Sequence, residues 1–507
     1  KKIKKCKFLF IHKFIFIFIV NVQKICTQFN TRGQNRAGYR SMQYFDKRPQ
    51  LDKHDDCPKS IQRFDLFNYI RCNMCLAMMI PLQLERFFPK GLSWFAKLLE
   101  LSLEIFLYFS TIHIGILYVC TLYLYYGNGD LEMHVNCLMQ TIIYFWSIGM
   151  KIYFRRMQNK TLMYIFDSIN MKYSTRSAKG FTYITMDESF AMANKYLNIF
   201  VISCVTGTIF WLVLPIAYGD HSLPLSCWYP FDYKKPIIYE TLYFLQFVGQ
   251  LQIAASFSSS SGFFMILSIL MSGQYDILFC SLKNLIATVY IDLEYSNEDL
   301  KALEEQQSIA NAEINQYYCS KERTVRLQCI PHLRAEDLAA NKSQSRSMAF
   351  RKALKNCVDQ HRFIVSSLET IEKFYNPIWF LKTGEVIFLM CLVAFVSVKS
   401  TTANTSFFKI ISLGQYLMLV AVEMLIICYF GEVIYLNSKR CGEALFRSPW
   451  HLHAPEMKSD ILIFLLNAKR PFKFTAGKIQ TVNVDRFRGV MTTAFSFLTL
   501  LQKMDQR

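Results

Sequence analysis

The hydrophobic pattern of the chain consists of long uncharged runs. Four runs lack Asp, Glu, Lys and Arg altogether, namely residues 105–129, 133–150, 196–219 and 241–275. Because an α-helix rises about 1.5 Å per residue, about 20 apolar residues span the hydrocarbon core of a bilayer. Each run is therefore predicted to form a membrane-spanning helix. The fourth run is too long for one crossing, and we expect its helix to project into water at one end.

Three weaker candidates lie toward the carboxyl terminus. Residues 377–398 carry Lys382 and Glu385 near their start, and residues 407–437 contain three ionisable side chains. Residues 489–502 are only 14 uncharged residues, or about 21 Å of helix, which is short for a helix in contact with lipid. A helix that is surrounded by protein or lines water need not be uniformly apolar. We therefore predict an all-α membrane protein with seven spanning helices.

The charges of the loops predict the orientation of these helices. Residues 151–195 and residues 439–478 each hold eight cations and three acids. Residues 128–134 hold no cation, and residues 401–406 hold no charge at all. Because cytosolic loops carry the excess of Lys and Arg, the first two loops are placed inside. The amino terminus is then cytosolic and the carboxyl terminus extracellular.

The same pattern divides the chain into segments. We expect a cytosolic helical segment at residues 42–93, helices one to four at residues 94–275, and a cytosolic helical loop at residues 276–375 that could anchor an assembly. Helices five to seven follow at residues 376–507, with the last helix at residues 479–504. Asn376-Pro377 is interpreted as the start of the fifth helix, because proline favours the first helical position.

The composition is basic but poor in charge. The formal net charge is +19, yet 52% of the residues are apolar and only 19% are charged, against about 25% in soluble domains. Nucleic-acid binding would explain the positive charge but not the shortage of polar surface, so we expect no nucleic-acid partner. Both features are expected of a membrane protein whose apolar residues face lipid and whose Lys and Arg lie in loops on one side.

Much of the positive charge lies in residues 1–41, which hold ten Lys or Arg and no acid. This stretch does not begin with Met, and its apolar run Phe14–Val20 is too short to span a membrane. We interpret residues 1–41 as a non-native upstream extension, with Met42 as the start. From Met42 onward, 47 cations and 38 acids leave a net charge of +9.

The sequence lacks the common motifs for catalysis and cofactor binding. The sequence has no Gly-rich phosphate loop, no nucleophile elbow and no HExxH motif. Cys72-x-x-Cys75 has no second pair nearby, and His451-x-His453 is a weak pattern. We expect no enzyme, no metal site and no cofactor.

Small residues cluster in the fourth run, at Ala254, Ala255 and Ser256–Gly262. Small side chains allow membrane helices to approach closely, and hydroxyl groups can bond to neighbouring helices. We interpret the cluster as close packing against a partner helix, with a permeation path as the alternative.

Several stretches of the sequence resemble the insect odorant receptors. They are Leu223–Asp232 (LPLSCWYPFD), Cys428–Val433 (CYFGEV), Asn437–Ala444 (NSKRCGEA) and the block Thr475–Met504. The last block is the most specific and is similar to the moth and butterfly branch of the family. The resemblance covers about residues 44–507, and the orientation deduced from the loops agrees with it.

The resemblance implies a function. Members of the family are ligand-gated, non-selective cation channels, in which a tuning subunit forms a heterotetramer with a shared odorant co-receptor. The chain does not resemble the co-receptor itself, so the implied role is that of an odorant-binding tuning subunit in the plasma membrane of olfactory sensory neurons. Its pore helix would be residues 479–504, with a gate near Leu500 and an outer mouth at Gln502 and Lys503.

The resemblance also implies a pocket for a small, hydrophobic volatile among the second, third, fourth and sixth helices. Apolar surface contributes about 25 cal/mol per Å² buried, and a few amides or hydroxyls fix the orientation of the ligand. The residues offered there are Tyr144, Phe145, Thr208, Trp211, Phe244, Phe247, Gln250, Gln415 and Tyr416. The alternative for each is ordinary helix packing.

Other receptor and transport classes are alternatives. A gustatory-type receptor channel would act without the co-receptor. A G-protein-coupled receptor would have the opposite orientation, and Asp485-Arg486-Phe487 precedes the seventh apolar run (residues 489–502) instead of ending the third. A transporter would show internal hydropathy repeats, which the two halves of the chain do not show clearly.

Overall fold

The computed structural model describes residues 65–505, with gaps. The positions outside the description are 83, 85–91, 126–130, 219–222, 226, 294–296, 312–316, 325–341, 403–406 and 454. The side chains of residues 131–132, 214–218, 236, 297, 306–311, 324, 342–345, 393–417, 447, 453, 498 and 501–505 are also outside it. The predicted extension at residues 1–41 and the start at Met42 therefore lie outside the described residues.

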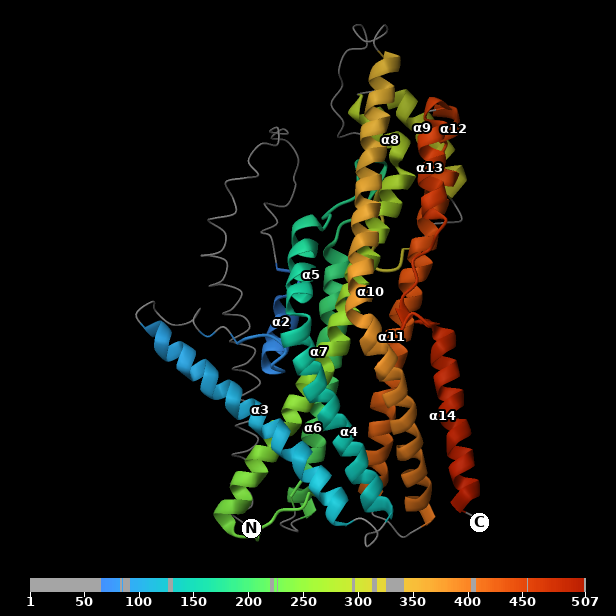
Figure 1. Ribbon diagram of the computed structural model, residues 1–507. Coiled ribbons are helices and arrows are strands. Elements are labelled where there is room, and N and C mark those ends of the chain that lie inside the picture. Colours follow the sequence, from blue (N-terminus) through green and yellow to red (C-terminus); the bar gives the residue numbers. More distant parts are fainter. Residues whose placement is uncertain are drawn as a thin grey trace.

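The described part of the chain is almost entirely helical, with long helices at the seven predicted places (Figure 1). These are α3 (Ser93–Leu124), α4 (Leu131–Ile152), α6 (Asp187–Tyr218), α7 (Pro236–Lys283), α10 (Lys342–Thr402), α11 (Phe407–Arg447) and α14 (Val484–Asp505). Within the described residues, four stretches are long and apolar enough by themselves to cross a membrane: Ser93–Leu124, Asp187–Val213, Ile237–Lys283 and Met418–Leu452. Of the other three helices, α10 and α14 correspond to weaker runs, as expected, whereas α4 was predicted from an uncharged run. Helix α11, which belongs to the four apolar stretches, was predicted from a weaker run. The all-α membrane fold is confirmed.

Helix α7 lies at the centre of the bundle and packs against α2 (Asn68–Leu76), α3, α4, α6, α10 and α11. Its 48 residues correspond to about 72 Å, more than twice the thickness of a hydrocarbon core. The prediction that the fourth spanning helix projects beyond the membrane is therefore confirmed. Its second half is buried almost without interruption, because the surrounding helices enclose it completely.

The projecting ends of α7 and α10 lie at the end of the molecule opposite to the carboxyl terminus of α14 (Figure 1). At this end lie α8 (Leu285–Asp292), α9 (Asn297–Asn311), α12 (Trp450–His453), the 3-10 turn Pro455–Met457 and α13 (Lys458–Ala468). The loop charges place this end in the cytosol, and it is called the cytosolic end below. A π-helical turn (Tyr153–Met157) and α5 (Asn159–Lys172) continue α4 toward it.

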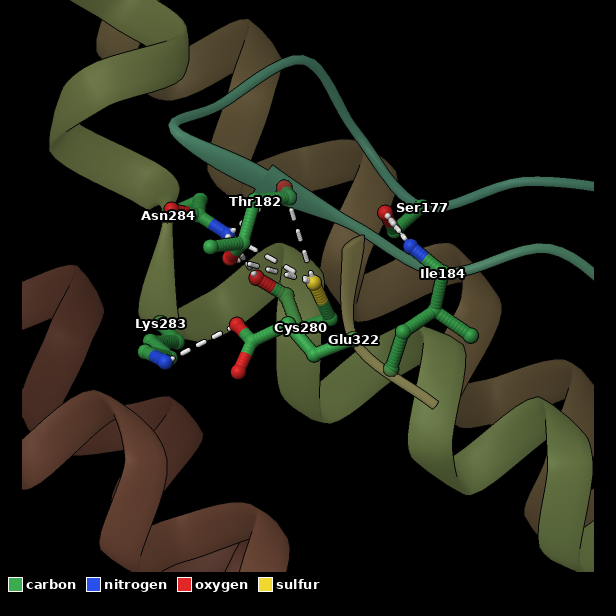
Figure 2. A network of polar contacts seen from close by, with 7 residues as sticks. All are labelled: Ser177, Thr182, Ile184, Cys280, Lys283, Asn284 and Glu322. Carbon is green, nitrogen blue, oxygen red and sulfur yellow. Dashed lines mark hydrogen bonds and ion pairs between the residues drawn. The ribbon is translucent and has the colours of Figure 1, made fainter. Parts of the chain in front are cut away.

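The end of α7 is fastened by side chains to a short two-stranded sheet of β1 (Thr182–Tyr183) and β2 (Arg323–Thr324). Asn284 donates from its side-chain amide to the backbone oxygen of Thr182 at 3.2 Å, and Lys283 lies 2.9 Å from the carboxylate of Glu322 (Figure 2). Segments about 100 residues apart in sequence are thereby held together where α7 ends.

Helix α10 contradicts one prediction, because Pro377 lies inside this 61-residue helix and not at its start. Proline removes one helical hydrogen bond and usually kinks or ends a helix. Here the hairpin of β3 (Thr475–Ala476) and β4 (Gln480–Thr481) supports the same turn: the Asn376 amide donates to the Thr475 backbone oxygen at 2.8 Å, and the Gly477 N–H donates to the Asn376 backbone oxygen at 3.3 Å. These contacts support the turn that contains Pro377, and the helix continues through it.

Aromatic side chains fill the core around this turn. Trp379 lies 4.8 Å from Phe264 and 5.2 Å from Phe474, measured between ring centroids. Phe154 and Phe374 make a similar edge contact at 4.9 Å. Edge-to-face contacts of this kind add about 0.5–1.5 kcal/mol each beyond the buried area. They hold α7, α10 and the hairpin before α14 in one rigid unit.

Candidate functional site

A cavity of about 390 Å³ lies between α4, α6, α7, α10 and α11. This volume falls within the range of small-molecule sites, about 300–1,000 Å³. On α4 the lining runs from Gln140 to Met150, which is about 15 Å along the helix axis. The cavity is therefore elongated along the bundle, with Gln140 toward the extracellular end and Met150 toward the cytosolic end.

The wall of the cavity is mainly aromatic and aliphatic. Trp146 comes from α4, Phe200 and Trp211 from α6, Phe257 from α7 and Leu389 from α10. Burial against such a wall stabilises a small apolar ligand by about 25 cal/mol per Å² of covered surface. The shape and the lining thus suit a compact hydrophobic molecule.

The cytosolic end of the cavity is charged. The ammonium of Lys382 lies 2.8 Å from the carboxylate of Glu385 and 2.9 Å from that of Glu423. The three side chains are 5%, 8% and 2% exposed, and Ser261 donates a hydrogen bond to Glu423. Lys382 and Glu385 line the cavity itself, so a ligand at this end would meet ionic groups.

Aromatic rings enclose the lysine. Its ammonium lies 5.2 Å from the centroid of the Trp146 ring and 5.3 Å from that of Phe257. Cation–π attraction at this distance contributes about 0.5–2 kcal/mol, more where water is excluded. The rings and the two carboxylates together hold Lys382 in one place, so the charged end is rigid.

Two hydroxyl groups on the lining have no hydrogen-bond partner. Ser147 of α4 and Ser256 of α7 are 4% and 3% exposed, and the oxygen of neither is bonded to another described group. Buried hydroxyls are normally satisfied. Both side chains line the cavity, where a ligand could bond to them.

The nine predicted ligand-binding residues divide into three groups. Thr208, Trp211 and Gln250 line the cavity. Gln415 and Tyr416 lie on α11, but their side chains are outside the described part of the structure.

The remaining four predicted residues do not line this cavity. Tyr144 is fully buried against Tyr118 of α3, with ring centroids 6.0 Å apart. Phe145 and Phe244 are 49% and 48% exposed on the outside of the bundle, and Phe247 lies elsewhere on α7. The four helices named from the sequence all border the cavity, together with α10. Sequence position did not show which side of each helix faces the cavity.

The predicted pore residues lie at the end of α14. Leu500 is 51% exposed, as are Phe495 (59%) and Phe497 (49%) nearby. The side chains of Gln502 and Lys503 are outside the described part. The opposite face of α14 packs on α10, where the Cys391 thiol donates to the backbone oxygen of Ala494 at 3.5 Å. Helix α14 therefore has one covered face and one open face.

The charged end of the cavity was not predicted, although the sequence contained a signal for it. Lys382 and Glu385 were noted only as residues that weaken the fifth run. Ionisable side chains inside a spanning helix are costly and generally face the protein interior or a cavity. Their spacing of three residues places both on one face of α10, which could have assigned them to a site.

The described residues do not form a metal site. Among the described residues, no three His, Cys, Asp or Glu side chains come together as metal ligands. The cavity lining offers apolar contact, hydrogen-bonding groups and charge.

Comparison with known proteins identifies the family. The sequence profile of the family described as 7tm Odorant receptor matches residues 133–495. Odorant receptor 83a of Drosophila melanogaster is 52% identical over 88% of this chain and 97% of its own length. Putative odorant receptor 85e of the same species is 35% identical over 83% of this chain and 88% of its own length.

The fold agrees with a solved structure of the same kind of protein. The insect olfactory receptor OR5 from Machilis hrabei, determined in complex with eugenol, superposes with a TM-score of 0.58 at 15% identity, covering 87% of this chain and 98% of that chain. Both sequence relatives come from a fly, so the finer resemblance to the moth and butterfly branch does not follow from them. The profile match and the 52% identity nevertheless establish that this chain is a member of the insect odorant receptor family, a family of receptors and not of enzymes.

Proposed function

We propose that the chain is the odorant-binding tuning subunit of a ligand-gated, non-selective cation channel in the plasma membrane of olfactory sensory neurons. The observation that carries this proposal is the 390 Å³ cavity inside the helix bundle, with its apolar wall and few polar groups. Thr208, Trp211 and Gln250 contact the ligand in this proposal, together with Trp146 and Phe200.

The open face of α14 supports an assembly of several chains. Phe495, Phe497 and Leu500 are about half exposed in the single chain, and a pore requires several such helices around one axis. The proposed assembly is a heterotetramer with the odorant co-receptor. Leu500 forms the gate in this assembly, and Gln502 and Lys503 lie at its outer mouth.

A direct contact connects the cavity to α14. Thr383 follows the cavity residue Lys382 on α10, and its hydroxyl oxygen accepts a hydrogen bond from the guanidinium of Arg486. A ligand that binds one arrangement of α10 more tightly than the other shifts the equilibrium between closed and open channel by that difference in affinity. Movement of α10 is proposed to reach α14 through this contact.

The test is electrical recording from cells that express the chain with the co-receptor, during a screen of volatiles. Odour-evoked cation current that requires both chains is expected. Responses that persist without the co-receptor would favour the gustatory-type alternative. Responses through a G protein in cells without ionic current would overturn the proposal.

A further inference from the structure

The charged end of the cavity has more negative than positive charge, and this imbalance bears on the proposed ligand site. One ammonium, on Lys382, faces two carboxylates, on Glu385 and Glu423. Among the described residues, the ion pairs recorded for Glu385 and Glu423 are both made with this one lysine. Buried charge without compensation is strongly unfavourable. The site therefore gains stability from one further positive charge.

That charge can be supplied from the cavity, because Glu385 is part of the cavity lining. Glu423 is not part of the lining of this cavity and accepts a hydrogen bond from Ser261, whereas Glu385 borders the cavity. Ser147 and Ser256 offer unpaired hydroxyl oxygens on the same lining. A carboxylate and two hydroxyls can each accept a hydrogen bond. Trp146 and Phe257 add aromatic surface that attracts cations.

We propose that the cavity recognises small aliphatic amines, with the ammonium group bound at Glu385 and the hydroxyls of Ser147 or Ser256, and the hydrocarbon part against Phe200 and Trp211. This inference rests on the proposed function for the place of the ligand, but not on channel opening. A carboxylic acid is disfavoured, because its ionised group would add a third carboxylate to the same end. An alcohol supplies a hydrogen bond without the compensating charge, so its affinity is expected to lie between those of the amine and the acid.

The test uses a matched series of hexylamine, hexanol and hexanoic acid. Binding is measured as thermal stabilisation of the purified full chain in detergent, and activation as current with the co-receptor. A hydrogen bond between charged partners is stronger than one between neutral groups. We expect hexylamine to act at concentrations at least about tenfold lower than hexanol, and hexanoic acid to be the weakest.

Substitutions distinguish the effect of the charge of Glu385 on binding from the effect of the cavity shape. Glu385→Gln retains the shape and makes the remaining pair neutral, so the preference for hexylamine over hexanol is expected to disappear. Glu369→Gln is the control, because Glu369 is exposed on the cytosolic part of the same helix. Ser256→Ala, which removes an unpaired hydroxyl and no ion pair, is expected to weaken hexylamine binding and is the second variant if Glu385→Gln does not fold.

The outcomes distinguish this inference from the proposed function. Equal stabilisation by amine and alcohol, stronger stabilisation by the acid, or an amine preference that survives Glu385→Gln would overturn the inference, whatever the currents show. Amine binding without any odour-evoked current would support the inference and contradict the channel proposal.

Discussion

The guanidinium of Arg440 lies 2.6 Å from the carboxylate of Asp276, and this contact joins α11 to α7 at the cytosolic end. The side chains are 9% and 0% exposed. Asp276 also accepts hydrogen bonds from the backbone N–H groups of Tyr318 and Cys319 at 3.4 and 2.8 Å. Helices α7 and α11 and the segment at Tyr318–Cys319 thus meet at the carboxylate of Asp276. This carboxylate lies about 60 Å along α7 from its first residue.

Breaking this contact is expected to destabilise the protein. Asp276→Asn or Arg440→Met leaves one buried charge without its partner, which typically costs about 3–5 kcal/mol. The measurement is the thermal unfolding of the purified receptor, followed by size-exclusion chromatography.

A surface ion pair provides the matched control for that measurement. Arg351 and Asp460 are 3.8 Å apart and 67% and 47% exposed, so Arg351→Met should change stability by less than about 1 kcal/mol. Equal losses in Arg440→Met and Arg351→Met would show that the buried pair has no special role.

The thiol of Cys319 should report on the same contact. Burial raises the pKa of Cys319 to about 12, so at neutral pH almost none of it is the reactive thiolate. We expect slow alkylation by maleimide in the native protein and much faster alkylation in Arg440→Met, because the segment that covers the thiol is released. Mass spectrometry of each cysteine measures this, with the partly exposed Cys72 as the internal reference. An equal alkylation rate of Cys319 in wild type and Arg440→Met would show that the ion pair does not hold this segment in place.

The helical framework was predictable because long apolar runs have one stable solution in a bilayer. The 35 uncharged residues before Asp276 predicted a helix longer than the membrane, and α7 is such a helix. A helical segment before Pro377 was also expected, and α10 includes one. What local sequence could not supply was the support of Pro377 by the hairpin at Thr475 and Gly477, since that contact joins segments about 100 residues apart.

The cavity was less predictable for a related reason. Aromatic residues such as Trp211 and Phe145 are equally suitable for a pocket, for the core and for lipid contact. Only the rotation of each helix decides among these places, and packing against other helices sets that rotation. Ionisable residues are more informative about the rotation of a helix, because contact with lipid costs them free energy. Lys382 and Glu385 are therefore expected to face the protein interior or a cavity.

Acidification should weaken the packing of α10 on α13. His361 of α10 lies 5.5 Å from Phe464 of α13, between ring centroids, and burial lowers the pKa of this histidine. Above its ordinary pKa of about 6.5, His361 is neutral in both states. As the pH falls below that value, the unfolded chain takes up a proton that the folded chain resists, so stability is lost.

The check is the melting temperature at pH values from 7.5 to 5.5. Wild type should lose more stability across this range than His361→Gln, which has no proton to gain. His451→Gln is the control, because His451 is exposed at the surface. A drop of the same size in wild type and His361→Gln would assign the pH dependence to other groups.

Truncation of the cavity wall should change odour sensitivity. Trp211 lines the cavity, and Trp211→Ala removes a large part of the apolar contact, so half-maximal concentrations of activating volatiles should shift by about tenfold or more. Phe145→Ala is the comparison, because Phe145 is 49% exposed outside the cavity. Dose–response currents and surface labelling of both variants measure the effect. A larger shift in Phe145→Ala than in Trp211→Ala would move the ligand site away from this cavity.

The contact between Thr383 and Arg486 should affect gating more than binding. Thr383→Val keeps the shape of the side chain but removes the oxygen that accepts from Arg486, and loss of one hydrogen bond to a charged group costs about 1.5–3 kcal/mol. If this contact transmits ligand binding from α10 to α14, the current evoked at saturating ligand should fall while thermal stabilisation by the same ligand is retained. Thr370→Val is the matched control, since the Thr370 hydroxyl donates within its own helix, to the backbone oxygen of Ser366 at 2.9 Å. Parallel loss of binding and current in Thr383→Val would instead place Thr383 in the ligand site, and an unchanged current would require another route from the cavity to α14.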